Sequence, residues 1–92
     1  MKIIRELTVK NDLGLHTVPS THILRILSPV DSTVMFTYQG ATINAKSLTS
    51  LLALCAKKGA KIMAEIDGID AEETMHKLEI AFNNKFGEKN EY

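Results

Sequence analysis

The sequence has little cysteine and no long apolar segment. Cys55 is the single cysteine among 92 residues, so no disulfide can form within the chain, and the Cys and His spacings typical of metal sites are absent. No stretch approaches the roughly 20 apolar residues that a membrane span needs. These absences favour a cytoplasmic protein with no bound metal and no membrane segment.

An excess of charge is also missing. The 11 Lys and Arg residues balance 11 Asp and Glu residues, so the net charge is zero, and neither sign forms a long run. A protein that binds nucleic acid or an anionic membrane usually carries a basic patch, and we therefore expect protein or small-molecule partners. The length and the 45% apolar content support one domain, residues 1–87, followed by a polar tail, residues 88–92.

The apolar pattern predicts seven elements in the order βαββαβα. Leu7 and Val9 belong to a strand pattern with a period of two, whereas Ile23 and Leu27 recur at helical spacing after a turn. The last helix has a start signal, with Asp70 as N-cap residue and an acidic residue three positions later. The predicted elements cover residues 2–10, 16–28, 33–38, 41–44, 47–56, 61–67 and 70–86.

Each predicted helix has an apolar face, which must pack against the apolar face of a sheet. The economical solution is an α/β two-layer sandwich. A ferredoxin-like arrangement with one added helix has the same element order, and the pattern alone leaves the strand pairing open.

His16 is the residue with the clearest chemical potential. It lies where the first strand pattern has ended and the first helix pattern begins, and Pro19 is acceptable in the first turn of that helix. The free amide groups of a helix N-terminus bind phosphate, and a histidine beside them could carry a phosphoryl group. An isolated histidine in such a place is more often an ordinary surface or capping residue.

Two motifs about 30 residues apart change that balance. Gly14-Leu15-His16-Thr17 followed by Pro19, and Ala45-Lys46-Ser47-Leu48 at the start of the second helix, resemble the HPr family, the histidine-containing phosphocarriers of the bacterial phosphoenolpyruvate-dependent phosphotransferase system. The resemblance covers nearly the whole chain. It implies an α+β open-faced sandwich, in which three helices cover one face of a four-stranded antiparallel sheet.

The resemblance also implies roles for individual residues. His16 would accept a phosphoryl group on Nδ1 from Enzyme I and pass it to an Enzyme IIA protein, so the chain would be a carrier and not an independent enzyme. Ser47 would be the target of an ATP-dependent serine kinase. No cofactor is implied, and we expect a monomer.

The resemblance also implies a docking surface around the histidine. The backbone N–H groups of Thr17 and Val18 would hold the phosphate at the positive end of the helix dipole. The remaining side chains expected on this surface are Leu15, Thr21, Leu48, Thr49 and Leu52.

One departure from the family pattern bears on the rate. The family has arginine two residues after the histidine, and this chain has Val18. A charge-assisted hydrogen bond from arginine contributes on the order of 1.5 to 3 kcal/mol, so its loss costs roughly ten- to a hundred-fold. This departure keeps a second hypothesis open, a regulatory binding module controlled at Ser47 in which transfer through His16 is slow or vestigial. A third hypothesis is a small interaction domain without phosphate chemistry.

The other histidines carry no such signal. His22 and His76 fall within helix patterns and have no second ligand at metal spacing. We expect both to be polar surface residues.

Overall fold

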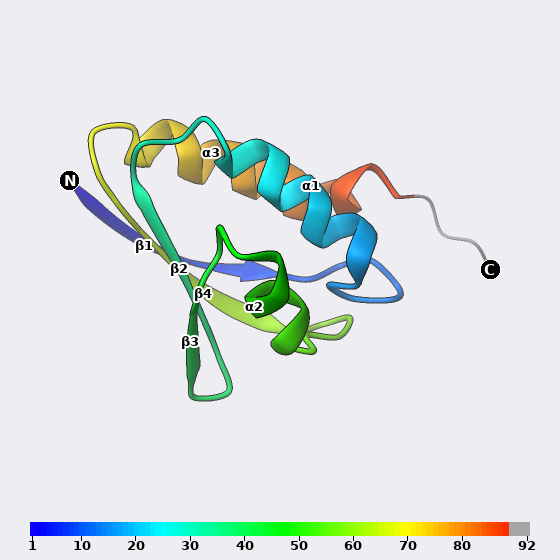
Figure 1. Ribbon diagram of the computed structural model, residues 1–92. Coiled ribbons are helices and arrows are strands. Elements are labelled where there is room, and N and C mark those ends of the chain that lie inside the picture. Colours follow the sequence, from blue (N-terminus) through cyan, green and yellow to red (C-terminus); the bar gives the residue numbers. More distant parts are fainter. Residues whose placement is uncertain (89–92) are drawn as a thin grey trace.

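Three helices lie on one side of a four-stranded antiparallel sheet (Figure 1). This computed structural model describes residues 1–88, so residues 89–92 of the predicted tail lie outside the described residues. The elements are β1 (Lys2–Thr8), α1 (Thr17–Leu27), β2 (Thr33–Tyr38), β3 (Ala41–Asn44), α2 (Leu48–Ala53), β4 (Lys61–Asp67), α3 (Ala71–Asn83) and a 3₁₀ turn, η1 (Lys85–Gly87). The predicted open-faced sandwich and its element order are therefore confirmed.

The sheet has the strand order β1-β4-β2-β3. One of its two inner strands, β4, alternates as predicted: Ile62, Ala64 and Ile66 are fully buried, while residues between them face the opposite side. The opposite face is bare enough to leave Ile4 and Met63 about half exposed. One covered and one open face is the usual arrangement of an antiparallel sheet in a two-layer fold.

The core fills the space between the covered face and the helices. Each helix supplies at least one side chain that is completely buried, such as Ile23 of α1, Leu51 of α2 and Leu78 of α3. Phe36 of β2 meets Phe82 of α3 edge to face, with ring centroids 6.1 Å apart. None of the helices within residues 1–88 is both long and apolar enough to cross a membrane.

Two helices end earlier than the apolar spacing predicted. The second was expected to reach residue 56, but α2 ends at Ala53, and Cys55 has a positive φ of 51°. The last was expected to include Phe86, but α3 ends at Asn83 and Phe86 lies in η1 with a φ of 58°. Phe86 is buried all the same, because the turn brings its ring back onto Phe82. Apolar spacing predicted the burial of Phe86 but not its backbone conformation.

The predicted N-cap position of Asp70 is confirmed, but its side chain bonds elsewhere. Asp70 is the N-cap residue of α3, but its side chain makes no capping bond to that helix. Its carboxylate instead accepts hydrogen bonds from the backbone N–H groups of Asp31 (2.9 Å) and Ser32 (3.0 Å) and from the Ser32 hydroxyl. The Ser32 hydroxyl bond, followed by the amide bond from Asp31, lowers the pKa of Asp70 below its ordinary value.

Candidate functional site

The loop between β1 and α1 is held against the segment that follows α2. The N–H of Leu15 donates to the carbonyl of Ala56 at 2.9 Å. Gly14 has a φ of 69°, and a Cβ on it would lie 2.3 Å from the same Ala56 oxygen. Only glycine allows both that conformation and that approach, so Gly14 fixes the path of the chain into the site.

His16 is the N-cap residue of α1, as the sequence predicted. Its carbonyl accepts the first helical hydrogen bond, from Ser20 N–H at 3.1 Å, and its own N–H donates to Gly14 O at 3.0 Å. Thr17 and Val18 are exposed in the first turn, where amide groups have no carbonyl partner within the helix. The buried Pro19 follows them and has no N–H to satisfy.

The imidazole ring of His16 contacts Glu88. Nε2 lies 3.0 Å from Oε2 and 3.2 Å from Oε1 of that carboxylate. Both side chains are partly covered, with exposed fractions of 31% for His16 and 25% for Glu88. Within residues 1–88, Nδ1 of His16 has no hydrogen-bond partner.

This contact corrects the prediction for the C-terminal segment. Glu88 was assigned to a polar tail beginning at residue 88, whereas it folds back onto a histidine 72 positions earlier in the chain. The nearest sequence signal was Phe86, an apolar residue two positions before it. That residue indicated that the core extends to the last described turn.

A buried asparagine, Asn11, also contacts the Glu88 carboxylate. Asn11 is 1% exposed, and its Nδ2 donates to Gly14 O at 2.6 Å and to Glu88 Oε1 at 3.0 Å. Its Oδ1 is buried without a partner among the described residues. One amide group therefore connects the loop before His16 to the carboxylate that contacts His16.

The turn η1 brings Glu88 into this position. Lys85, Phe86 and Gly87 have φ values of 59°, 58° and 78°, so three successive left-handed residues reverse the chain, and Glu88 N–H closes the turn on Lys85 O at 2.9 Å. Phe86 anchors it by packing edge to face on Phe82, at 4.8 Å between centroids. The position of Glu88 thus depends on the core through Phe86.

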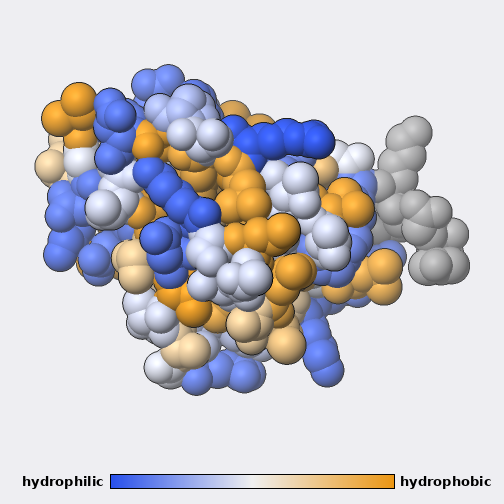
Figure 2. Space-filling view, viewed as in Figure 1, coloured by the Kyte–Doolittle hydropathy of each residue, from blue (hydrophilic) through white to orange (hydrophobic). Residues whose placement is uncertain are grey.

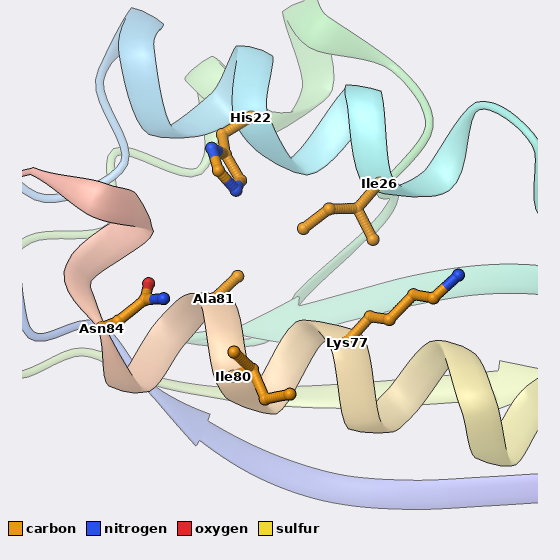
Figure 3. A pocket seen from close by; sticks show the side chains of 6 residues that line it. All are labelled: His22, Ile26, Lys77, Ile80, Ala81 and Asn84. Atoms are coloured by element: carbon orange, nitrogen blue, oxygen red, sulfur yellow. The ribbon is translucent and has the colours of Figure 1, made fainter.

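His22 is more enclosed than predicted. It was expected on the surface, but it is half-buried and its ring lies edge to face with Phe86, 6.2 Å between centroids. His22 also lines a shallow groove of about 250 Å³ between α1 and α3, together with Ile26, Lys77, Ile80, Ala81 and Asn84 (Figure 3). This groove contains none of the residues that the sequence predicted for phosphate binding, regulation or docking. His76 is exposed on α3 as expected.

Most of the predicted docking residues are accessible. Val18 is 57% exposed, and Leu48 and Leu52 on α2 are each 36% exposed. Thr49 is exposed and Thr21 is half-buried with its hydroxyl bonded to Thr17 O. Figure 2 shows apolar surface gathered over α1 and α2 on this face.

Leu15 is a correction to this set. It was expected on the docking surface, but it is 3% exposed and belongs to the core. An apolar side chain gains free energy on burial, and the Leu15 N–H bond to Ala56 O holds this part of the loop against the segment that follows α2.

Ser47 begins the short helix α2 as its N-cap residue. Its Oγ accepts a hydrogen bond from Ser50 N–H at 3.3 Å and lies 3.2 Å from Thr49 Oγ1. The side chain is half-buried, so the hydroxyl has a structural role whether or not it is modified. Within residues 1–88 no group of His, Cys, Asp and Glu has the arrangement of a metal site.

Sequence and structure comparisons agree on one family. A family model described as "PTS HPr component phosphorylation site" matches residues 3–84. A phosphocarrier protein HPr of Chlamydia pneumoniae is 41% identical over 80 residues, covering 87% of this chain and 74% of the relative. An HPr of Xylella fastidiosa (strain Temecula1) is 36% identical over 83 residues, covering 90% and 93%. The crystal structure of HPr-C-His from Thermoanaerobacter tengcongensis superposes with a TM-score of 0.90 at 26% identity, covering 95% of this chain and 98% of that one.

Proposed function

The chain belongs to the HPr family of phosphocarrier proteins of the bacterial phosphotransferase system, and from that premise we propose that His16 is its phosphoryl acceptor. In this proposal Enzyme I donates the group to Nδ1 and an Enzyme IIA protein receives it. The observation that carries the proposal is the position of His16 as N-cap of α1 with Nδ1 unpartnered within residues 1–88.

The first turn of α1 supports the chemistry at that atom. The N–H groups of Thr17 and Val18 have no helical acceptor, and the positive end of the helix dipole favours the added negative charge. No side-chain cation stands at position 18. The backbone therefore carries more of the phosphate binding here than in family members with arginine at that position.

The apolar surface next to His16 supports docking of other proteins. Val18, Leu48 and Leu52 are exposed, and Thr17, Thr21 and Thr49 add polar groups at its edge. A partner that covers this surface would bring its own phosphorylated or acceptor residue to His16 and hold it in line, which is the main requirement for transfer. The carrier works as a monomer in this proposal, and its lone Cys55 fits the reducing cytoplasm.

Labelling with Enzyme I and radioactive phosphoenolpyruvate tests the proposal. The wild type should acquire acid-labile phosphate, and His16→Ala should acquire none. His76→Ala is a matched control, because His76 is an exposed histidine on α3 and lies outside both motifs that carry the site. Absence of label on the wild type, or equal label on His16→Ala, would refute the assignment.

A regulatory role for Ser47 is the second proposal, favoured by the exposed Val18 in place of arginine. Phosphate on Ser47 would add about two negative charges at the start of α2, beside the exposed Leu48. Docking of partners should therefore change more than folding. Incubation with an ATP-dependent HPr serine kinase should label the wild type and the control Ser50→Ala but not Ser47→Ala, and label on Ser47→Ala would exclude this site.

A further inference from the structure

Glu88 determines which nitrogen of His16 is free. Both oxygens of its carboxylate lie within 3.2 Å of Nε2. An ionised carboxylate only accepts hydrogen bonds, so Nε2 must carry the proton and donate it. In the neutral ring the lone pair is then on Nδ1, the atom proposed above as the phosphoryl acceptor.

We propose that Glu88 is a positioning residue for phosphoryl transfer through His16. It holds the ring in one tautomer and one orientation, and it stabilises the positive charge that develops on the ring. This inference rests on the proposed function of His16, and it adds a group that neither of the two sequence motifs contains.

The transfer step can be written with all atoms assigned. The Nδ1 lone pair forms a bond to phosphorus, while the bond between phosphorus and the donor atom of the phosphorylated partner protein breaks and leaves its electron pair on that donor atom. The proton stays on Nε2, so the ring passes from neutral to imidazolium and no base has to remove a proton. The Glu88 carboxylate faces that new charge directly, and the same events in reverse deliver the group to the acceptor.

The carboxylate also repels the incoming phosphate, and distance decides which effect is larger. Nε2–H is in direct contact with Glu88, whereas the phosphoryl group is attached on the other nitrogen of the ring. Coulomb energy falls with separation, so per unit of charge the attraction to the adjacent ring exceeds the repulsion from the more distant phosphoryl group. A carboxylate hydrogen-bonded to the far nitrogen of a reacting imidazole has this stabilising role in catalytic triads.

The surroundings of Glu88 indicate a built position and not a chance contact. Asn11, buried to 1% exposure, donates to Oε1, and the turn η1 is anchored by the buried Phe86. The carboxylate is therefore oriented from two directions before any partner binds. Preorganisation of this kind lowers the cost of reaching the transition state.

Kinetics of phosphorylation by phosphorylated Enzyme I provide the first measurement. Glu88→Ala should lower kcat about tenfold and change KM less than about twofold. This loss of rate corresponds to the lower part of the range for a charge-assisted hydrogen bond, because both side chains are partly exposed. Glu88→Gln should lie between Glu88→Ala and the wild type, because its carbonyl can still accept from Nε2–H. Glu79→Gln is the matched control, since Glu79 is similarly covered but pairs with Arg5, and it should leave kcat unchanged.

Nitrogen-15 NMR of the unphosphorylated protein provides a second measurement that needs no transfer. The wild type should show a slowly exchanging proton on Nε2 of His16, and Glu88→Ala should lose that signal while keeping its thermal unfolding midpoint within about 3 °C. If the wild type takes phosphate and Glu88→Ala keeps the wild-type kcat, the inference about Glu88 is overturned while the proposed function of His16 stands. An equal loss of kcat in Glu88→Ala and Glu79→Gln would also overturn it. A wild type that takes no phosphate would overturn the proposed function, even with the Nε2 proton signal present.

Discussion

Replacing Gly14 by alanine should destabilise the protein far more than the same change at another left-handed glycine. Gly14 has a φ of 69°, and its Cβ would lie 2.3 Å from Ala56 O and 2.8 Å from Lys57 Cα. Both neighbours are backbone atoms, so a flexible side chain cannot move aside to make room. The loop itself must shift, and the Leu15 N–H bond to Ala56 O, 2.9 Å long, must break.

The expected magnitude follows from three contributions. An L-residue in the left-handed region costs about 1 to 2 kcal/mol, a lost backbone hydrogen bond about 1 kcal/mol, and relief of a close contact in a packed region about 1 to 3 kcal/mol. Gly14→Ala should therefore lose about 3 to 6 kcal/mol of unfolding free energy, a large part of the stability of a domain this size.

Gly40→Ala is the control that carries only the conformational cost of a positive φ, without a close contact of the added Cβ. Gly40 has a φ of 80°, and nothing lies within 4 Å of its added Cβ. Gly40→Ala should lower the unfolding free energy by about 1 kcal/mol, since the cost of alanine in the left-handed region is partly offset by a less flexible unfolded chain. Urea unfolding of both variants measures the difference, and a difference below about 1 kcal/mol would show that the contact between Gly14 and Ala56 does not constrain the loop.

Three further changes test other parts of the molecule. Val18→Arg should raise the rate of phosphorylation of His16 up to about tenfold, because it adds a cation at an exposed position; an unchanged rate in stopped-flow transfer would mean that another cation already supplies the charge. Cys55→Gly should raise the unfolding free energy by up to about 1 kcal/mol, because the left-handed φ of 51° costs cysteine more than glycine loses in chain entropy; a loss in urea unfolding would contradict this. Asp70→Asn should lower stability at neutral pH, because the lowered pKa of Asp70 means that its ionised form favours the folded state. That contribution is present above the ordinary value of 3.8 and is lost as pH falls through the lower folded value, so thermal midpoints of variant and wild type should converge in acid.

The sequence predicted the position of His16 at a helix N-terminus but not the contact of His16 with Glu88. His16 was expected at the beginning of a helix because a strand pattern, a turn with Gly14 and an N-terminal proline are all local signals. The strand order could not be read from the pattern, because alternation shows which face is buried and not which strands pair. The family resemblance implied four antiparallel strands but not their order.

What the pattern missed depends on long-range contacts or backbone conformation. Phe86 fits helical spacing after Phe82, yet a left-handed turn places it equally well in the core, and apolar spacing does not separate the two. Leu15 lies beside His16 in sequence, but its side chain belongs to the core. Glu88 in a polar segment resembles any solvated glutamate, and its contact with His16 is visible only when both ends of the chain are brought together.

The distance along the chain between these partners has a consequence during synthesis. β1 pairs only with β4 in the described sheet, Thr8 opposite Lys61, so β1 has no neighbouring strand until β4 has also been made. Glu88 follows His16 by 72 residues, which at about 5 to 20 residues per second takes a ribosome roughly 4 to 14 s. For that interval a nascent chain contains the histidine without the carboxylate that contacts it, so the site is incomplete.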